Sequence, residues 1–494
     1  MKQLTKFLCI IVFVLGLFVP GGCSTNPATG RQSFTAFMSR EKEAEIGAEE
    51  HPKILKELGG SYNDIDLGAY IARIGSQLAV LSELPEIQWR FTVLNDHRVN
   101  AFALPGGYIY ITRGLLALAE NEAQVAGVLA HEIGHVTARH SAQRYSTAMA
   151  TNLGLTVLGA LGNAAGVPAG VGRLANFGAQ AALQQYSQSQ ELEADMLGVR
   201  YMIRAGYSSD GMTNFFRKLK AHSELEARQQ GRKGTNHNIM STHPRSEDRI
   251  AQAIKLTKQK GVQPSRIRRN VYLTAIDGLV FGDDPKQGVR RGRTFMHPEL
   301  RVAFKVPPNF VMINSPRRVI AFGPKKSKII FDMIGHKQAT KVKSLTDYVS
   351  KQWGRDLIGR EKLERLTING LEGATIKGQI SGQDDARDVR LVVVRGAQEQ
   401  VFRFAFITKP SETLRLAEGL RRTTYSLRRL SEKEANAIRP LRIRIRTVKP
   451  GDTAIALAQQ YPIERFQNEW FRLLNNVKTT EKFKSGQKVK MIMD

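Results

Sequence analysis

The chain has 494 residues and a mass of 55.1 kDa, a length that predicts roughly two to four domains at about 100–200 residues each. Hydrophobic residues make up 42% and charged residues 24%, so a packed core is possible, and a mean hydropathy of −0.29 excludes a polytopic membrane protein. Both cysteines, Cys9 and Cys23, lie near the N-terminus, which excludes a disulfide-stapled fold and a cysteine-ligated metal site in the rest of the chain.

The positive charge is concentrated in the second half of the chain. Of the net charge of +28, residues 24–260 carry +3, whereas residues 261–494 carry +23, with 46 Lys and Arg against 23 Asp and Glu. A basic half joined to a nearly neutral half predicts an anionic neighbour for the basic half. On charge alone, the candidates are nucleic acid, anionic lipid headgroups and an acidic cell-wall polymer.

The N-terminal segment has the organisation of a secretory signal. Lys2 and Lys6 precede an uncharged apolar run over residues 7–19. These 13 residues are too few to span a bilayer, which needs about 20, but they fit the apolar region of a signal peptide. We therefore expect residues 1–22 to be a signal peptide and the mature chain to be exported.

The end of this segment resembles a bacterial lipoprotein signal. Small Gly22 precedes Cys23, although Pro20 stands where a leucine is usual. The resemblance implies that Cys23 is acylated and anchors the mature chain to a membrane, and Ser24 indicates the outer membrane with the protein in the periplasm. A cleaved signal without lipid and an uncleaved anchor are the alternatives.

Two strands are predicted before the first motif that carries chemistry. Residues 89–94 and 108–112 alternate in polarity around the turn-rich segment Leu104-Pro105-Gly106-Gly107. We expect these strands to lie beside the helix that follows them.

Residues 120–144 have apolar side chains at helical spacing and no proline, which predicts a helix. It contains His131-Glu132-Ile133-Gly134-His135, and such a match arises by chance in roughly 0.01 chains of this composition. Residues four apart share a helix face, so His131 and His135 can bind one Zn²⁺ from adjacent turns. Glu132 lies beside the first of them and can accept a proton from a water activated at the metal.

His140 is a possible third ligand on this helix. At about 100° per residue, it is predicted to face away from His135. Ala138 and Ser141 also break the longer motif in which a third histidine follows, so the chain is not a metzincin. The third ligand is therefore expected elsewhere.

A second helix is predicted over residues 184–200. Glu191 and Asp195 are four residues apart and share a face, whereas Glu193 is predicted to point roughly the opposite way. Glu191 can complete a His₂Glu site with water in the fourth position, and Asp195 can accept the outer N–H of a ligand histidine. Alone, this acidic stretch would be read as an ordinary solvated helix.

Between these helices, residues 147–183 are rich in glycine and alanine. A mobile lid, a tightly packed helical hairpin of small residues, and a segment that contacts the membrane or a partner are all compatible with this composition.

Residues 261–269 form a plausible linker, and a basic domain is predicted over 261–440. Two helices, near 344–353 and 411–426, interrupt short apolar runs, which predicts an α+β domain with an antiparallel sheet and no catalytic constellation. The predicted strands are Leu300–Val306, Val319–Phe322, Ile329–Met333, Ala374–Ile380, Val389–Val394 and Val401–Ile407. Scattered basic residues without clustered aromatics, together with the export signal, argue against nucleic acid as a partner.

Residues 441–494 resemble a LysM module, a small βααβ fold that binds N-acetylglucosamine polymers. The resemblance rests on Val448–Thr453, Phe471–Asn476 and Lys484–Val489, while residues 461–470 are irregular for the family. It implies binding of peptidoglycan, and a remnant that binds protein or anionic lipid is the alternative.

The HExxH motif and Glu191-Leu-Glu-Ala-Asp195 together resemble the BepA/HtpX-type gluzincin metallopeptidases, metallopeptidase family forty-eight. The resemblance covers about residues 26–260. It is similar to the periplasm-facing members, because no membrane-spanning segments flank the motif. Further matches lie in Asn26–Gly30, Asn100–Gly107, Thr112–Leu116 and Thr242–Pro244.

The resemblance implies an α+β chain in which a mainly helical protease domain with a small sheet spans residues 23–260. It implies one Zn²⁺ ligated by His131, His135 and Glu191. Glu132 matches the general base, and Asp195 matches the outer partner of a ligand histidine.

The resemblance also places His243 near the metal, where it either stabilises the transition state or acts as a fourth ligand that blocks the water. An edge strand within residues 100–112 would bind the substrate in extended form, as in other gluzincins.

These features predict an exported, membrane-anchored zinc endopeptidase that cleaves misfolded or stalled cell-envelope proteins. The alternatives are an envelope chaperone or assembly scaffold with a latent protease site, and a protein tethered to the cell wall through its basic half.

Overall fold

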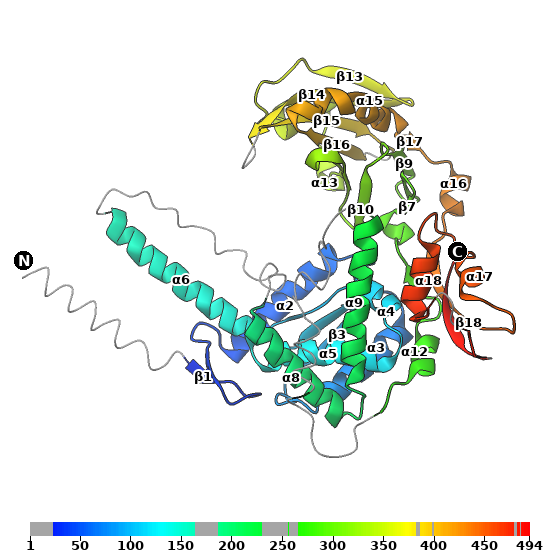
Figure 1. Ribbon diagram of the computed structural model, residues 1–494. Coiled ribbons are helices and arrows are strands. Elements are labelled where there is room, and N and C mark those ends of the chain that lie inside the picture. The colour runs from blue at the N-terminus through cyan, green and yellow to red at the C-terminus, as the bar shows by residue number, and fades with distance from the viewer. Residues whose placement is uncertain are drawn as a thin grey trace, which may run out of the picture. The chain divides into compact units, whose positions relative to one another are not determined.

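The computed structural model describes residues 23–163, 186–229, 255, 265–381, 386–397, 400–478, 482–484 and 486–494, the side chains of 152–163 excepted. Helices and strands alternate along it, which confirms a mixed α and β protein. The chain divides into two compact units, the first made of residues 1–56, 60–279 and 443–493 and the second of residues 57–59, 280–442 and 494 (Figure 1). The predicted domain boundaries near 260 and 440 stay predictions.

A short β-hairpin begins the described part of the first unit. Strands β1 (Cys23–Thr25) and β2 (Gln32–Phe34) are antiparallel, with Cys23 opposite Phe34. The turn between them is closed by the Gly30 amide, which donates to the Asn26 carbonyl at 2.8 Å, and Gly30 takes the left-handed φ of 71° that glycine permits. Two helices follow the hairpin, α2 (Arg40–Glu57) and α3 (Ile65–Ala79).

A three-stranded sheet of order β3-β5-β4 comes next, formed by β3 (Arg90–Leu94), β4 (Ala101–Leu104) and β5 (Tyr108–Thr112). β3 runs parallel to β5, and β4 runs antiparallel to it with Ala101 opposite Ile111. The two predicted strands are confirmed, and β4 is an additional strand at the edge. Thr112 ends the sheet and caps the short helix α4 (Arg113–Leu118), because its hydroxyl accepts from the Leu115 amide.

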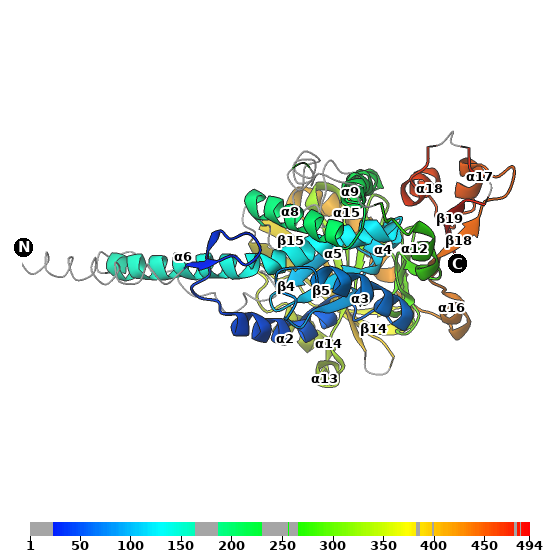
Figure 2. The same ribbon diagram turned by 90° about the horizontal axis from the view of Figure 1, so that it is seen from below.

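Helix α5 (Glu122–Thr137) lies between the sheet and helix α8 (Gln188–Arg204), as both views show (Figures 1 and 2). The Asn121 side chain accepts from the Gln124 amide and begins α5, and the pair Ser187 and Gln190 forms a capping box that begins α8. Nearly every residue of α5 is buried. The helix predicted over 184–200 is confirmed as α8, whereas the helix predicted over 120–144 is broken after Thr137 and only its first part is α5. α5 and α8 pack against each other.

Glycines allow α5 and α8 to approach closely. A Cβ at Gly134 would lie 2.9 Å from the Ala194 carbonyl oxygen, and one at Gly198 would lie 3.1 Å from the His131 amide nitrogen. Such distances are too short for a side chain, so the two backbones meet only because these positions lack one. This contact brings the two motifs together.

Two further helices pack near this pair. α6 (His140–Asn163) follows α5 after a break, and α9 (Asp210–Gln229) follows α8. Residues 147–163 of the glycine- and alanine-rich segment are thus helical, while 164–185 lie outside the described residues.

The C-terminal part of the first unit has the order strand, helix, helix, strand. It comprises β18 (Leu441–Thr447), α17 (Ala454–Ala458), α18 (Gln467–Asn475) and β19 (Lys488–Met493), preceded far upstream by α12 (Arg269–Ala275). Leu441 and Arg442, at the start of β18, pair with the two-residue strand β6 (Val280–Phe281), and these four residues belong to the second unit. The predicted βααβ order is observed, and the likeness to a LysM module stays a prediction.

A buried lysine fastens this C-terminal segment to the helix that precedes α5. The Lys490 ammonium donates to the Ala117 and Ala119 carbonyls at 2.7 Å and to the Leu118 carbonyl at 3.3 Å. These are the last carbonyl groups of α4, which have no partner within the helix itself. Lys218 of α9 supports the same contact, because it donates to Glu120 and to the Leu474 carbonyl.

The second unit is built on a seven-stranded antiparallel sheet of order β10-β11-β12-β16-β15-β14-β13. Alternation along β15 places Val392 and Val394 in one apolar cluster and Leu391 and Val393 in another, so both faces of the sheet are covered. The strands are β10 (Val311–Ser315), β11 (Arg318–Phe322), β12 (Lys328–Met333), β13 (Glu364–Ile368), β14 (Leu371–Ser381), β15 (Ala386–Arg395) and β16 (Val401–Thr408).

A four-stranded sheet of order β17-β9-β8-β7 accompanies it. Its strands are β7 (Val289–Arg291), β8 (Thr294–His297), β9 (Val302–Lys305) and β17 (Arg428–Arg429). The helices of this unit are α13 (His336–Ala339), α14 (Leu345–Asp347), the π-helix η3 (Tyr348–Trp353), α15 (Pro410–Ser426) and α16 (Glu432–Ala437), with 3₁₀ turns η1 (Pro285–Gln287) and η2 (Pro324–Lys326). The predicted antiparallel sheet and both predicted helices are confirmed.

Within the described ranges, no helix combines the length and apolar character needed to cross a membrane.

We expect Lys490→Met to lower the free energy of unfolding by about 1–3 kcal/mol, because three buried carbonyl groups lose their donor. Lys484→Met, at an exposed position of the same segment, serves as the control. Chemical denaturation monitored by circular dichroism measures both. A Lys490 variant as stable as the control would contradict the structural role of this contact.

Acid should destabilise the first unit through His222 of α9, whose ring lies 5.7 Å from that of Trp470. Burial lowers the pKa of His222 to about 4, although Glu226 approaches its Nδ1 at 3.7 Å. Because the folded-state pKa lies below the unfolded value of about 6.5, this contribution to stability is complete above pH 6.5 and is lost as the pH falls toward 4, by up to about 3 kcal/mol. Thermal unfolding should show a shallower acid dependence for His222→Gln than for the wild type.

Candidate metal centre

Three side chains from α5 and α8 converge in the core of the first unit. One ligand atom each of His131, His135 and Glu191 lies within 4.8 Å of the others, and all three residues are buried. The two imidazole Nε2 atoms are 2.9 Å apart, and the Glu191 carboxylate lies 3.4 Å from Nε2 of His135 and 3.8 Å from Nε2 of His131. Two ring nitrogens and a carboxylate directed at one buried point can hold a metal ion.

The donor set suits a metal better than a self-contained hydrogen-bond cluster. Both histidines point a ring nitrogen at each other, and both also approach the same carboxylate. Only one hydrogen can lie between two such nitrogens, whereas a cation satisfies both lone pairs and the carboxylate charge at once. Two histidines and one glutamate form the ligand set of many catalytic zinc sites.

Asp195 orients the first histidine. Its carboxylate lies 2.9 Å from Nδ1 of His131, one helical turn beyond Glu191 on α8. A proton on Nδ1 leaves Nε2 of His131 unprotonated and directed at the cluster. The side chain of Asp195 therefore fixes the tautomer that a ligand histidine needs.

Glu132 is fully buried next to His131 on α5. It is not one of the three residues whose ligand atoms converge. Its predicted role as the general base stays a prediction.

The prediction that His140 faces away from His135 is wrong, whereas Glu193 lies outside the three converging groups, as expected. Nδ1 of His140 lies 2.8 Å from Nδ1 of His135, and Nε2 of His140 lies 3.1 Å from the Glu193 carboxylate. The physical reason is a break in the helix: α5 ends at Thr137, and Arg139 adopts a left-handed φ of 55° before α6 begins. A helical wheel drawn through residue 140 assumes a continuous helix and so misplaces the ring.

Burial is the largest influence on both of these groups. It lowers the pKa of the His140 ring and outweighs the opposing effect of Glu193. Burial raises the pKa of Glu193, but the hydrogen bond from His140 reverses this and leaves the pKa below its usual value.

A tyrosine outside the predicted set covers the second histidine. The Tyr186 ring stacks on the His135 ring with centroids 3.8 Å apart. On the other side, the guanidinium of Arg144, a residue of α6, lies 3.9 Å from the centre of the Tyr186 ring. Burial raises the pKa of the Tyr186 hydroxyl. The isolated tyrosine carries no motif, and no signal in the sequence pointed to it.

The structure describes the remaining predicted site residues only in part. His243 lies outside the described residues. Cys23 is the first residue of β1, and the structure describes its backbone only. Strand β4, within the predicted substrate-binding region 100–112, lies at the edge of its sheet and packs beside α5.

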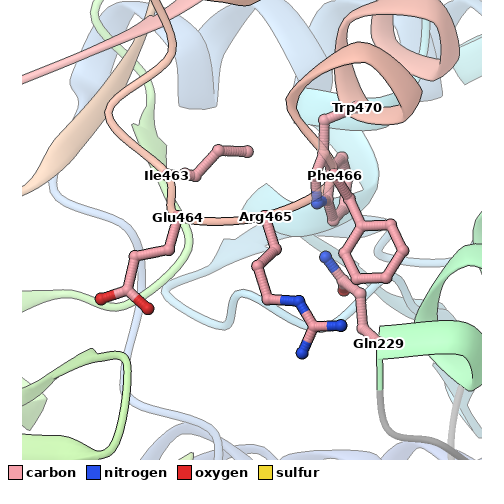
Figure 3. A pocket seen from close by; sticks show the side chains of 6 residues that line it. All are labelled: Gln229, Ile463, Glu464, Arg465, Phe466 and Trp470. Carbon is pink, nitrogen blue, oxygen red and sulfur yellow. The ribbon is translucent and has the colours of Figure 1, made fainter.

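A separate open pocket of about 260 Å³ lies where the loop before α18 meets the end of α9. Figure 3 shows Arg465, Phe466, Trp470 and Gln229 grouped together, with Glu464 pointing away from them. The Phe466 ring already lies 5.3 Å from the Arg465 guanidinium and 6.0 Å from that of Arg228. The pocket holds none of the three converging ligand residues.

Comparison with known proteins identifies the segment that carries the cluster. Residues 67–257 match Peptidase family M48. The chain is 33% identical over 230 residues to the beta-barrel assembly-enhancing protease of Escherichia coli K12, covering 44% of this chain and 45% of the relative. It is 28% identical over 228 residues to the mitochondrial metalloendopeptidase OMA1 of Schizosaccharomyces pombe, covering 45% of this chain and 63% of the relative.

The segment that carries both motifs therefore matches Peptidase family M48, in agreement with the resemblance inferred from those motifs. The chain spans less than half of the length of the first of these relatives. The match ends at residue 257, so it does not extend over the second unit or the C-terminal segment.

We expect the purified chain to bind one equivalent of zinc and His135→Ala to lose it, because two remaining ligands hold the ion poorly. His336→Ala, an exposed histidine on α13, should retain the full equivalent. Elemental analysis after dialysis measures the metal content. Stoichiometric zinc in the His135 variant would overturn the ligand assignment.

Proposed function

We propose that this chain is a zinc-dependent endopeptidase. The observation that carries the proposal is the convergence of His131, His135 and Glu191 beside Glu132 within the segment that matches Peptidase family M48. Glu132 adds a third buried carboxylate to those of Glu191 and Asp195, more than a purely structural cluster would need.

In the proposed mechanism, His131, His135 and Glu191 would hold Zn²⁺. When bound, zinc polarises the scissile carbonyl and lowers the pKa of water to about 7. Glu132 accepts a proton from the attacking water and later donates it to the leaving amine. Asp195 keeps the His131 ring in its ligating tautomer.

We propose that the substrate binds as an extended strand along β4. Among the residues that the structure describes, β4 pairs with β5 alone and lies next to α5, so a peptide added at its other edge would run past the metal site. Backbone hydrogen bonds would supply most of the affinity, which suits an enzyme that acts on varied unfolded segments.

We propose that the substrates are misfolded or stalled envelope proteins and that the protein works in the periplasm at the outer membrane. The name of the Escherichia coli relative, a beta-barrel assembly-enhancing protease, supports this setting. Acylation of Cys23 would provide the membrane anchor, and residues 1–22 would be its signal peptide.

For the basic remainder of the chain we propose contact with peptidoglycan or anionic lipid headgroups and none with nucleic acid. The net charge of +23 over residues 261–494 supports an anionic neighbour. His243 is proposed to act near the metal, either on the transition state or as a ligand that blocks the water.

We expect Glu132→Gln to retain zinc and to lower the rate of cleavage of an unfolded protein by about 10²–10⁴-fold, because the general base is removed while the ligands stay. Residues 24–494 incubated with unfolded casein, with gel electrophoresis and metal analysis on each sample, provide the measurement.

Glu49→Gln, an exposed position on α2, should cleave at the wild-type rate, and a chelator should stop cleavage by the wild type. Normal turnover by the Glu132 variant would refute the mechanism. Zinc binding without cleavage by the wild type would favour the alternative of an envelope chaperone or scaffold with a latent site.

A further inference from the structure

The turn Asn26-Pro-Ala-Thr-Gly30 has no task in the proposed chemistry. It joins β1 to β2 at the start of the described chain, far from the two motifs in sequence. Asn26 is nevertheless buried, with 2% of its surface exposed. A buried polar side chain in a tight turn requires partners, and these partners lead to the metal cluster.

The first step of this connection starts at His135. Its Nε2 faces Nε2 of His131 and the Glu191 carboxylate, so Nδ1 lies on the opposite side of the ring, 2.8 Å from Nδ1 of His140. A histidine that ligates through Nε2 carries its hydrogen on Nδ1. His135 therefore donates to His140, and Nδ1 of His140 accepts.

The second step follows from the acceptor role of His140. Because its Nδ1 accepts from His135, the hydrogen of this imidazole is on Nε2, which lies 3.1 Å from Oε2 of Glu193. Glu193 accepts this hydrogen bond. The orientation of each group thus determines that of the next.

Asn26 is the last member of this series of hydrogen bonds. Its Nδ2 donates to Oε1 of Glu193 at 3.2 Å and to the Ala138 carbonyl at 3.2 Å. Its Oδ1 accepts from the Ala28 amide at 2.9 Å, which fixes the orientation of the side-chain amide. Arg200 of α8 holds the same turn by donating to the Ala28 carbonyl at 3.1 Å.

We propose that Asn26, Glu193 and His140 are positioning residues that hold His135 in its ligating tautomer through a directed hydrogen-bond chain. The two ligand histidines are then supported differently: His131 directly by Asp195, and His135 by a carboxylate one imidazole further away. This inference rests on the proposed zinc site and adds to it the hairpin that begins at Cys23.

Isosteric variants test which group donates and which accepts in each of these hydrogen bonds. In Glu193→Gln, the amide can present its oxygen to His140 or to Asn26 but not to both, so one contact becomes a clash of two donors. In Asn26→Asp, the donor to Glu193 is lost and two carboxylates face each other. Each single change should weaken metal binding about 10–100-fold, the range found when outer partners of ligand histidines are removed.

The double variant Asn26→Asp with Glu193→Gln separates orientation from simple damage. The carboxylate introduced at position 26 can accept from the amide introduced at position 193, and the oxygen of that amide can then accept from His140. The series of hydrogen bonds is thus restored, with donor and acceptor exchanged between positions 26 and 193. Metal affinity should recover by about tenfold or more over either single variant, and the lost donation to the Ala138 carbonyl keeps the recovery incomplete.

The experiment is competition for Zn²⁺ against a chromophoric chelator, supported by visible spectra of the Co²⁺-loaded proteins and thermal unfolding of the metal-free forms. Glu49→Gln, exposed on α2, is the matched control. Weaker single variants and a recovered double variant support the proposal. Single variants within twofold of the wild type, or a double variant weaker than both, overturn it. A wild type that binds no zinc overturns the proposed function as well, which distinguishes the two failures.

Discussion

The burial of ionisable side chains between two helices constrains the structure more than any other feature. His131, Glu132, His135, Glu191 and Asp195 are all almost fully inaccessible to solvent at the contact of α5 with α8. Such groups are costly in a dry interior unless they bond to each other or to a cation. The close helix contact, allowed by glycine at positions 134 and 198, brings His131, His135 and Glu191 to one point, where a bound metal ion would satisfy all three.

Polar clusters also hold both ends of α5. At its start, Glu122 is fully buried and accepts from the Tyr70 and Tyr207 hydroxyl groups at 2.7 and 2.6 Å. At its end, Arg139 donates to Glu43 at 3.0 Å and to the Met38 carbonyl at 2.7 Å. These bonds join α5 to three other parts of the first unit. A rigid helix keeps ligand atoms in position before a metal arrives, which lowers the cost of ordering them on binding.

Local patterns in the sequence predicted the local structure, but they did not predict the contacts between residues far apart in the sequence. The spacing of His131 and His135, and of Glu191 and Asp195, repeats with the helix, so their shared faces followed from geometry alone. His140 did not, because the left-handed residue that turns the chain is an arginine, for which sequence gives no warning. Lys490 meets Ala119 across 371 residues. Its strand predicts a buried face, but nothing in the sequence identifies the carbonyl groups that receive it.

The hairpin that leads to Asn26 has a mechanical consequence. Asn26 follows Cys23 by only three positions, a span of about 10 Å even when fully extended. A lipid on Cys23 would therefore be joined to the candidate metal centre by a short ordered segment. A disordered linker would allow a much wider range of distances from the membrane. The cleavage site would operate at one height above the bilayer. A protease anchored in this way would select the part of a substrate that passes at that distance from the bilayer. Recognition of individual side chains would come second.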